Sequence, residues 1–159
     1  MNKIYFLLGS NQHEPEKQLK TAQKYIQKEI GSIQRLSSIY QTAAWGKRNQ
    51  PDFLNQVLIV STTLTPQQTI KILLDIEKKM GRVRTIKNAP RIIDIDILFF
   101  NKEIIKTPLL ELPHPRIQLR RFVLVPLNEL SPNFKHPVFN TTIHNLLQNC
   151  PDTLTVNKI

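Results

Sequence analysis

Two patterns of hydrophobic residues, dense apolar runs and apolar residues three or four apart, predict where the chain forms strands and helices. Short runs dense in apolar residues, which are typical of buried strands, occupy Lys3–Leu8, Ile33–Gln41, Leu54–Leu64 and Ile93–Phe100. Apolar residues three or four apart predict helices from Pro15 to about Glu29 and from Pro66 to Gly81, the second with Thr65 as its N-cap. The predicted order is therefore β-α-β-β-α-β.

The chain after Phe100 has weaker signals. They predict a turn at Asn101-Lys102, a short hairpin arm at Glu103–Ile105, a short helix or turn at Arg120–Leu130, a helix at Thr142–Gln148 and a terminal strand at Leu154–Val156. Two consecutive strands flanked by helix–strand units favour an α+β fold of the ferredoxin-like type, an antiparallel sheet with helices packed on it and a C-terminal extension. Because no linker or repeat divides the sequence, we expect residues 1–159 to form a single domain.

Composition adds one unusual feature to this picture, the charge. The chain has 159 residues, of which 40% are hydrophobic and 21% are charged, as is ordinary for a soluble globular protein. No apolar run approaches the ~18 residues of a membrane helix, and a single cysteine, Cys150, excludes an internal disulfide. We therefore expect a cytoplasmic protein. The net charge of +10 favours an anionic partner, whether nucleic acid, nucleotide or anionic membrane, and does not choose among them.

Two carboxylates, Asp94 and Asp96, interrupt the apolar run at Ile93–Phe100. Residues two apart on a strand face the same side and lie about 6.6 Å apart, so these side chains project together while the isoleucines around them point into a core. Like charges so placed repel, and a divalent cation is the simplest remedy. Hard oxygen ligands with few protein donors favour Mg²⁺ that shares its shell with phosphates.

Four cations precede the aspartates, namely Arg82, Arg84, Lys87 and Arg91. None of the four glycines of the chain lies in a G-x-x-x-x-G-K-[ST] or G-x-G-x-x-G motif, so side-chain cations and a metal would have to bind a triphosphate here. A second cluster follows at Arg116, Arg120 and Arg121. Two alternatives stay open: each cation is a solvated surface charge, or the arginines at 82, 84 and 91 pair with the aspartates in a structural ion network.

His114 and the loop from Thr42 to Asn55 supply the other candidate residues. His114 lies in Leu-Pro-His-Pro-Arg, where two prolines restrict the backbone and hold the imidazole in place; the alternative is a histidine without a function. In the loop, Trp45 and Phe53 offer aromatic faces and Asn55 offers an amide, which would suit a flat heterocycle. The alternative is that both aromatic side chains only pack in the core or the loop.

Several short motifs follow one another along nearly the whole chain. They are Gly9-Ser10-Asn11, Ser38-Ile39-Tyr40-Gln41-Thr42, Gln50-Pro51-Asp52-Phe53-Leu54-Asn55, Glu77, Gly81-Arg82-Val83-Arg84, Pro90-Arg91-Ile92-Ile93-Asp94-Ile95-Asp96-Ile97, Leu112-Pro113-His114-Pro115-Arg116 and Arg121-Phe122-Val123-Leu124-Val125-Pro126-Leu127. In content and order this set resembles the 6-hydroxymethyl-7,8-dihydropterin pyrophosphokinase family of folate biosynthesis. The aspartate and histidine motifs are highly specific.

The resemblance implies a reaction and a set of site residues. The reaction is transfer of the β,γ-pyrophosphoryl group of the co-substrate ATP to the hydroxymethyl oxygen of the pterin, with release of AMP. Two Mg²⁺ ions are implied, with Asp94 and Asp96 as metal ligands, and Asp96 is our candidate for a general base. The implied site residues are Arg82, Arg91 and Asp96 in catalysis, Glu77, Arg84, Lys87, His114 and Arg120 on ATP, and Thr42, Ala43, Phe53, Asn55 and Phe122 on the pterin.

The chain departs from the family pattern just before the aspartates. Where Arg-Trp-Gly-Pro-Arg is common, this chain has Lys87-Asn88-Ala89-Pro90-Arg91, in a loop one residue shorter than in many members. It therefore lacks the tryptophan that covers the closed site in the family, and Trp45, one loop away, is the candidate substitute. The change bears on the geometry of the lid and on substrate affinity rather than on the chemistry.

A module that binds RNA or single-stranded DNA is the alternative hypothesis, because ferredoxin-like sheets commonly have this function and the net charge is +10. Against it, no aromatic-rich strand of the RNA-binding type is present, and two aspartates on an exposed sheet would repel phosphate. We therefore expect a monomeric enzyme that binds ATP and the pterin but neither nucleic acid nor membrane.

Overall fold

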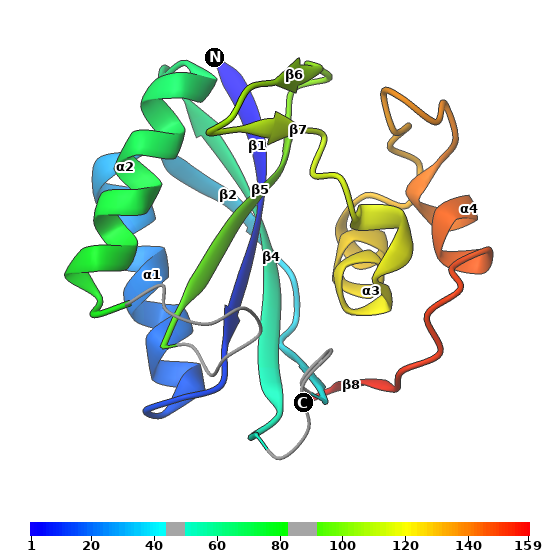
Figure 1. Cartoon of the computed structure of the whole chain (residues 1–159), viewed down its shortest axis with the longest axis horizontal. Coiled ribbons are helices and arrows are strands. Elements are labelled where there is room, and N and C mark those ends of the chain that lie inside the picture. The colour runs from blue at the N-terminus through cyan, green and yellow to red at the C-terminus, as the bar shows by residue number, and fades with distance from the viewer. Residues whose placement is uncertain (44–49, 83–91) are drawn as a thin grey trace.

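The fold is organised around one antiparallel sheet (Figure 1). The structure is a computed structural model that describes residues 1–43, 50–82 and 92–159. Within these ranges six strands join in the order β5-β1-β4-β3-β8, and β2 also pairs with β4. The strands are β1 (Asn2–Ser10), β2 (Ser32–Leu36), β3 (Tyr40–Thr42), β4 (Phe53–Thr62), β5 (Asp94–Phe100) and β8 (Val156–Lys158). Every pairing in this sheet is antiparallel.

Helices cover both faces of the sheet (Figure 1). One face packs against α1 (Pro15–Glu29) and α2 (Pro66–Lys79), and the other packs against α3 (Arg121–Leu130) and α4 (Ile143–Gln148). A 3₁₀ turn, η1 (Ile117–Leu119), precedes α3, and β6 (Ile105–Lys106) pairs with β7 (Glu111–Leu112) in a separate two-stranded sheet. Among the described residues no helix has the length and apolar character needed to cross a membrane.

Helix α2 shows how local sequence sets an element. The Thr65 hydroxyl accepts a hydrogen bond from the Gln68 backbone N–H at 3.1 Å, and the Gln68 side chain accepts one from the Thr65 N–H at 2.9 Å. This reciprocal capping box satisfies two amides that the first helical turn leaves without a partner. After the helix, Gly81 adopts a φ of 89°, a conformation that other residues rarely adopt. The predicted N-cap and glycine stop are thereby confirmed.

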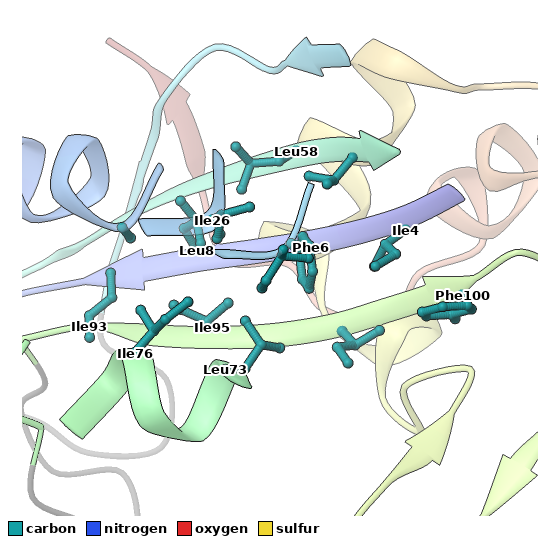
Figure 2. Close-up of a cluster of buried hydrophobic side chains, with 14 of the residues drawn as sticks. Ile4, Phe6, Leu8, Ile26, Leu58, Leu73, Ile76, Ile93, Ile95 and Phe100 are labelled. Atoms are coloured by element: carbon teal, nitrogen blue, oxygen red, sulfur yellow. The ribbon is translucent and has the colours of Figure 1, made fainter. Parts of the chain in front are cut away.

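Both faces of the sheet are apolar, which explains why the strands read as dense apolar runs rather than strict alternations. On β1, Ile4, Phe6 and Leu8 lie in the core beneath α1 and α2, while the residues between them lie in a second core beneath α3 and α4. Figure 2 shows the first core, where the strand residues meet Leu73 and Ile76 of α2. Each such side chain contributes roughly 1.5–3 kcal/mol by leaving water.

The predicted antiparallel sheet with packed helices is confirmed, and the finer ferredoxin-like assignment stays a prediction. The predicted single strand at Ile33–Gln41 is wrong, because the chain forms β2 and β3 with a break between them. At the break the Ser37 hydroxyl accepts a hydrogen bond from the Val57 N–H at 2.9 Å, a position that a backbone carbonyl fills in a regular ladder. The Ser38 N–H is bonded to the Glu129 carboxylate instead of to a strand.

Three boundaries in the second half of the chain also differ from prediction. The arm expected at Glu103–Ile105 lies at Ile105–Lys106 and pairs with β7 instead of returning to β5. The element predicted over Arg120–Leu130 is a helix that begins at Arg121. The terminal strand lies at Val156–Lys158, two residues later than predicted, because the Asp152 carboxylate accepts the Leu154 N–H at 3.0 Å and holds that residue outside the ladder.

His136 is a buried histidine that packs on aromatic rings of the second core. Its side chain lies edge-on to Phe99, with ring centroids 5.5 Å apart, and it is 3% exposed. Its Nδ1 accepts the backbone N–H groups of Val138 and Phe139 at 3.1 and 3.2 Å, which places the proton of the neutral ring on Nε2. Burial lowers the pKa of His136 to about 4, so the ring is neutral at pH 7.

The stability of the fold should therefore decrease in mild acid through His136. Below pH 6.5 the unfolded chain protonates this histidine whereas the folded chain stays neutral until about pH 4, so stability is lost as the pH falls across that interval. Between pH 7 and pH 5 the expected loss is on the order of 2 kcal/mol. His136→Asn keeps an acceptor for the two N–H groups but does not titrate. Urea unfolding across pH should show a flatter profile for the variant, and parallel profiles would contradict the assignment.

Candidate active site

A row of three residues across the sheet forms the floor of a pocket. In the register of the strands, Gly9 of β1 lies opposite Asn55 of β4 on one side and opposite Asp94 of β5 on the other. Gly9 has no side chain, so the row has a hollow between an amide and a carboxylate roughly two strand spacings, or about 10 Å, apart. A Cβ atom at Gly9 would come within 3.2 Å of Asn55 Oδ1 and 3.8 Å of Phe53 Cδ1.

The pocket above this floor brings most of the predicted site together. Its lining consists of Leu7, Gly9, Thr42, Ala43, Phe53, Asn55, Asp94, Asp96, Arg120 and Phe122. All five residues that the sequence assigned to the pterin are among them, together with both aspartates. Their elements are far apart in the chain: Phe53 and Asn55 come from β4, the aspartates from β5, and Phe122 from the first turn of α3.

Asn55 is held in one orientation inside this pocket. Its Nδ2 donates a hydrogen bond to Thr42 Oγ1 at 3.1 Å, and both residues are buried. With the amide nitrogen engaged in this way, Oδ1 lies on the side of Gly9. The pocket therefore presents a fixed hydrogen-bond acceptor close to two aromatic rings, an arrangement suited to a flat heterocycle that carries N–H donors on its edge.

Asp94 and Asp96 lie on one face of β5, as predicted. Ile93, Ile95 and Ile97 point the other way and are 0–4% exposed, in the core beneath α1 and α2. Burial, together with the negative charges of Asp94 and Glu77 and against the opposing charges of Arg120 and Arg82, raises the pKa of Asp96 to about 8. A second negative charge is therefore costly at this position in the absence of an additional cation.

An ion network holds one of the two aspartates in place. Arg82 Nη1 donates to Glu77 Oε2 at 2.9 Å and also to Asp94 Oδ1, and the Arg82 side chain is only 8% exposed. Glu77 Oε2 also accepts the backbone N–H of Ile95 at 2.9 Å, which ties α2 to β5. Arg82 therefore takes part in the structural ion network that the sequence left open as the alternative to phosphate binding. The contact of Glu77 with the nucleotide stays a prediction.

His114 is fixed as a neutral hydrogen-bond donor. Its backbone N–H donates to the Leu98 carbonyl at 3.0 Å, and its Nδ1 accepts the Arg116 N–H at 3.2 Å, so the ring proton lies on Nε2. Burial, reinforced by the positive charges of Arg120 and Arg116 and partly offset by Asp94, lowers the pKa of His114 to about 4. At neutral pH the ring can donate a hydrogen bond without adding a charge.

A second pocket lies between α2, β5 and β7. Its lining is mostly aliphatic and consists of Ile70, Leu73, Leu74, Glu77, Ile95, Asp96, Ile97, Leu109, Leu110, Glu111, His114 and Pro115. Asp96 lines both this pocket and the first one. Asp96 thus stands at the boundary between an aromatic pocket and an aliphatic pocket, beside Asp94 in the aromatic one, where a group bound in one pocket could pass to a molecule bound in the other.

Not every predicted residue can be placed. Arg84, Lys87, Arg91 and Trp45 lie outside the described residues, so their assignments stay predictions. The Arg120 guanidinium lies 5.7 Å from the centre of the Phe122 ring, on the wall of the first pocket.

Across residues 1–43, 50–82 and 92–159 no group of three or more His, Cys, Asp or Glu side chains forms a ready metal cage. The carboxylate pair offers hard oxygen donors that suit a divalent cation completing its shell with phosphate oxygens.

Two lining residues, Leu7 and Gly9, were not assigned to the site from the sequence. The sequence did give an indication for Gly9, because a glycine inside an apolar strand often marks close approach of a ligand or another chain segment. Leu7 had none, because a leucine in a strand is ordinary until the register places it opposite Asp96.

Comparisons with known proteins identify relatives of this chain. Residues 5–132 match the model of the 7,8-dihydro-6-hydroxymethylpterin-pyrophosphokinase (HPPK) family. A 2-amino-4-hydroxy-6-hydroxymethyldihydropteridine pyrophosphokinase of Aquifex aeolicus is 40% identical over 139 residues, which are 87% of this chain and 86% of that protein. The protein of the same name from Bacillus subtilis is 39% identical over 132 residues, covering 82% of this chain and 79% of its own length.

Longer proteins match as well. The folic acid synthesis protein FOL1 of Dictyostelium discoideum is 39% identical over 158 residues. The match covers 99% of this chain but only 24% of that protein. A crystal structure of Plasmodium falciparum HPPK-DHPS superposes with a TM-score of 0.78 at 21% identity, over 92% of this chain and 45% of that one. At that identity the likeness shows the fold.

The floor of the aromatic pocket can be tested with Gly9→Ala. The new methyl group would press on Asn55 Oδ1 and fill the hollow, so affinity for a hydroxymethylpterin should fall at least about tenfold. Affinity for ATP should change less than about twofold, because the second pocket does not include Gly9. Fluorescence titration of the pterin measures the first value. Ser61→Ala, far along β4, is the control, and unaltered pterin affinity in a folded Gly9→Ala protein would refute the assignment.

Proposed function

Because the chain belongs to the HPPK family, we propose that it transfers the β,γ-pyrophosphoryl group of ATP to the hydroxymethyl oxygen of 6-hydroxymethyl-7,8-dihydropterin in folate biosynthesis. The observation that carries the proposal is the position of Asp94 and Asp96. They line a pocket suited to a pterin, and Asp96 also lines a second pocket suited to a nucleotide. The transferred group would cross the boundary between the two pockets at these carboxylates.

The pterin fits the aromatic pocket. Its flat bicyclic ring would lie between Phe53 and Phe122, with its N–H edge toward Asn55 Oδ1 and the hollow at Gly9. Backbone groups of Thr42 and Ala43 would complete the contacts to the ring, as the family resemblance implies. Because the amide of Asn55 is already oriented, little freedom is lost when the ring binds.

ATP fits the aliphatic pocket and the basic residues around it. The leucines and isoleucines of α2 and β5 would cover the base, and His114 would donate its Nε2–H to a phosphate oxygen. Arg120 lies on the pterin side of the boundary and would contact the transferred phosphates from there. Glu77, Arg84, Lys87 and Arg91 complete the proposed set of residues around ATP.

Asp94 and Asp96 would hold Mg²⁺, and two ions are expected on the resemblance. Bound cations would neutralise the charge of the phosphates and of the two carboxylates, where burial and the neighbouring negative charges raise the pKa of Asp96. Arg82 fixes Asp94 from the protein side through its bonds to Glu77 and Asp94. Its part in catalysis would be to keep that carboxylate aimed at the pocket boundary.

The bond changes follow from the products. The hydroxymethyl oxygen forms a bond to the β-phosphorus, and the bond between that phosphorus and the oxygen bridging to the α-phosphorus breaks. AMP leaves with the bridging oxygen, and the proton of the hydroxyl group goes to a base, for which we propose Asp96. Holding both substrates across one boundary converts a bimolecular encounter into a step within one complex.

The same proposal covers fold type and partners. The sheet order with β1 between β4 and β5, all antiparallel, supports the ferredoxin-like assignment. We propose a monomer located in the cytoplasm, with the two small substrates as its partners. Helices cover both faces of the sheet, so its described part offers no open sheet face for RNA, and the nucleic-acid alternative has no support.

Replacing either carboxylate should stop turnover while the protein stays folded. With ATP, Mg²⁺ and the pterin alcohol, Asp94→Ala and Asp96→Ala should each reduce AMP release at least about 100-fold, because each removes a charge that positions the cation and phosphates. Asp75→Ala, an exposed aspartate on α2, is the matched control and should retain full activity. Circular dichroism verifies folding. Near-normal AMP release in a folded Asp94→Ala or Asp96→Ala protein would overturn the metal assignment.

A further inference from the structure

We infer that the C-terminal segment, residues 151–159, positions two walls of the pterin pocket and that Asp152 is its main positioning residue. The inference rests on the proposed function, because it concerns the affinity of that site for its pterin. The segment lies beyond residues 5–132, which match the family model, and it lines neither of the two pockets described above. It acts on the pocket through α3 and β3.

Asp152 supplies the cap that α3 does not have locally. No side-chain hydrogen bond from its N-cap residue, Arg120, reaches the first turn. Instead, Asp152 Oδ2, from 31 residues further along the chain, accepts the backbone N–H of Arg121 at 3.0 Å. This carboxylate satisfies an otherwise orphaned amide and places a negative charge at the positive end of the helix. The next residue is Phe122, the aromatic wall of the pocket.

Asp152 is itself held in position by the turn that follows it. Its second oxygen, Oδ1, accepts the Leu154 N–H at 3.0 Å, so both carboxylate oxygens are engaged. The chain then continues into β8, where Val156 lies opposite Thr42 and Lys158 lies opposite Tyr40. One short segment thus joins the start of α3 to the edge of the sheet.

Strand β3 carries the other wall. It has three residues, pairs with β4 on one side and has β8 on the other. Thr42 at its end orients the Asn55 amide, and Ala43 follows on the pocket lining. The Ile159 N–H also donates to the Ile39 carbonyl at 3.0 Å, which extends the contact past the ladder. A strand this short depends on pairing on both sides to keep a fixed place.

A second link joins α3 to this sheet edge. Glu129, near the end of α3, accepts hydrogen bonds from the Tyr40 hydroxyl at 2.7 Å and from the Ser38 N–H at 3.1 Å. Helix α3 is therefore attached to the β3 edge at its far end by Glu129 and at its near end by Asp152. Loss of the Asp152 bond frees the end of α3 that carries Phe122, while the far end stays attached.

The test uses the full-length chain with Asp152→Ala and Asp152→Asn, and steady-state AMP release is measured as each substrate is varied. Asp152→Ala should raise the KM for the pterin about fivefold to tenfold, as expected when a helix cap is lost, and change the KM for ATP and kcat less than about twofold. Asp152→Asn keeps one acceptor oxygen and should recover part of the loss. Thr153→Ala, an exposed neighbour, should match the wild type.

The outcomes separate this inference from the proposed function. If the wild-type protein releases no AMP, the proposed function fails and the inference fails with it. If the wild type is active but Asp152→Ala raises both KM values equally, or lowers kcat in step with a loss of folded protein, the segment only stabilises the fold and the inference alone is overturned. A pterin KM equal to that of the wild type in folded Asp152→Ala also overturns the inference. Where Asp152→Ala does not fold, Asp152→Asn gives the same comparison: KM values for the pterin and for ATP that rise equally would contradict the inference.

Discussion

Crowding of negative charge at one end of the sheet is the constraint on which the site depends. Asp94, Asp96 and Glu77 come together there because β5 alternates aspartates with core isoleucines and α2 packs against that strand. Arg82 offsets part of this charge through its bonds to Glu77 and Asp94, yet the pKa of Asp96 stays raised by burial and by its acidic neighbours. Binding of a positive charge beside Asp94 and Asp96 is therefore favourable, and a cation bound to a triphosphate would provide that charge.

The same strands place that point between two unlike pockets. On the α3 side, the missing side chain at Gly9 leaves room for a flat ring between Asn55 and Asp94. On the α2 side, aliphatic side chains and the neutral His114 form a second surface, and Asp96 lies on the boundary. This is possible because helices pack on both faces of the sheet and β5 has residues in both cores. The shape of the site is therefore a consequence of the register of β1, β4 and β5.

Features set by residues close together in the sequence were predicted, whereas features set by residues far apart were not. The helix ends at Thr65 and Gly81, and the shared face of the aspartates, depend on residues a few positions apart and were predicted correctly. The break at Ser37, the hollow at Gly9 and the cap from Asp152 depend on partners 20 to 85 positions away, which no local pattern contains. Pocket-lining residues such as Phe122 were proposed through motif resemblance rather than through periodicity.

The central claim, that the two pockets meet so that a pyrophosphoryl group crosses at the carboxylates, is tested most directly by the fate of a labelled phosphorus. ATP that carries ³²P at the β-position is incubated with the protein, Mg²⁺ and the pterin alcohol, and the products are separated. The account predicts that the label moves to the pterin and that the nucleotide product is unlabelled AMP. Label retained in ADP, with only the γ-phosphoryl group on the pterin, would contradict it.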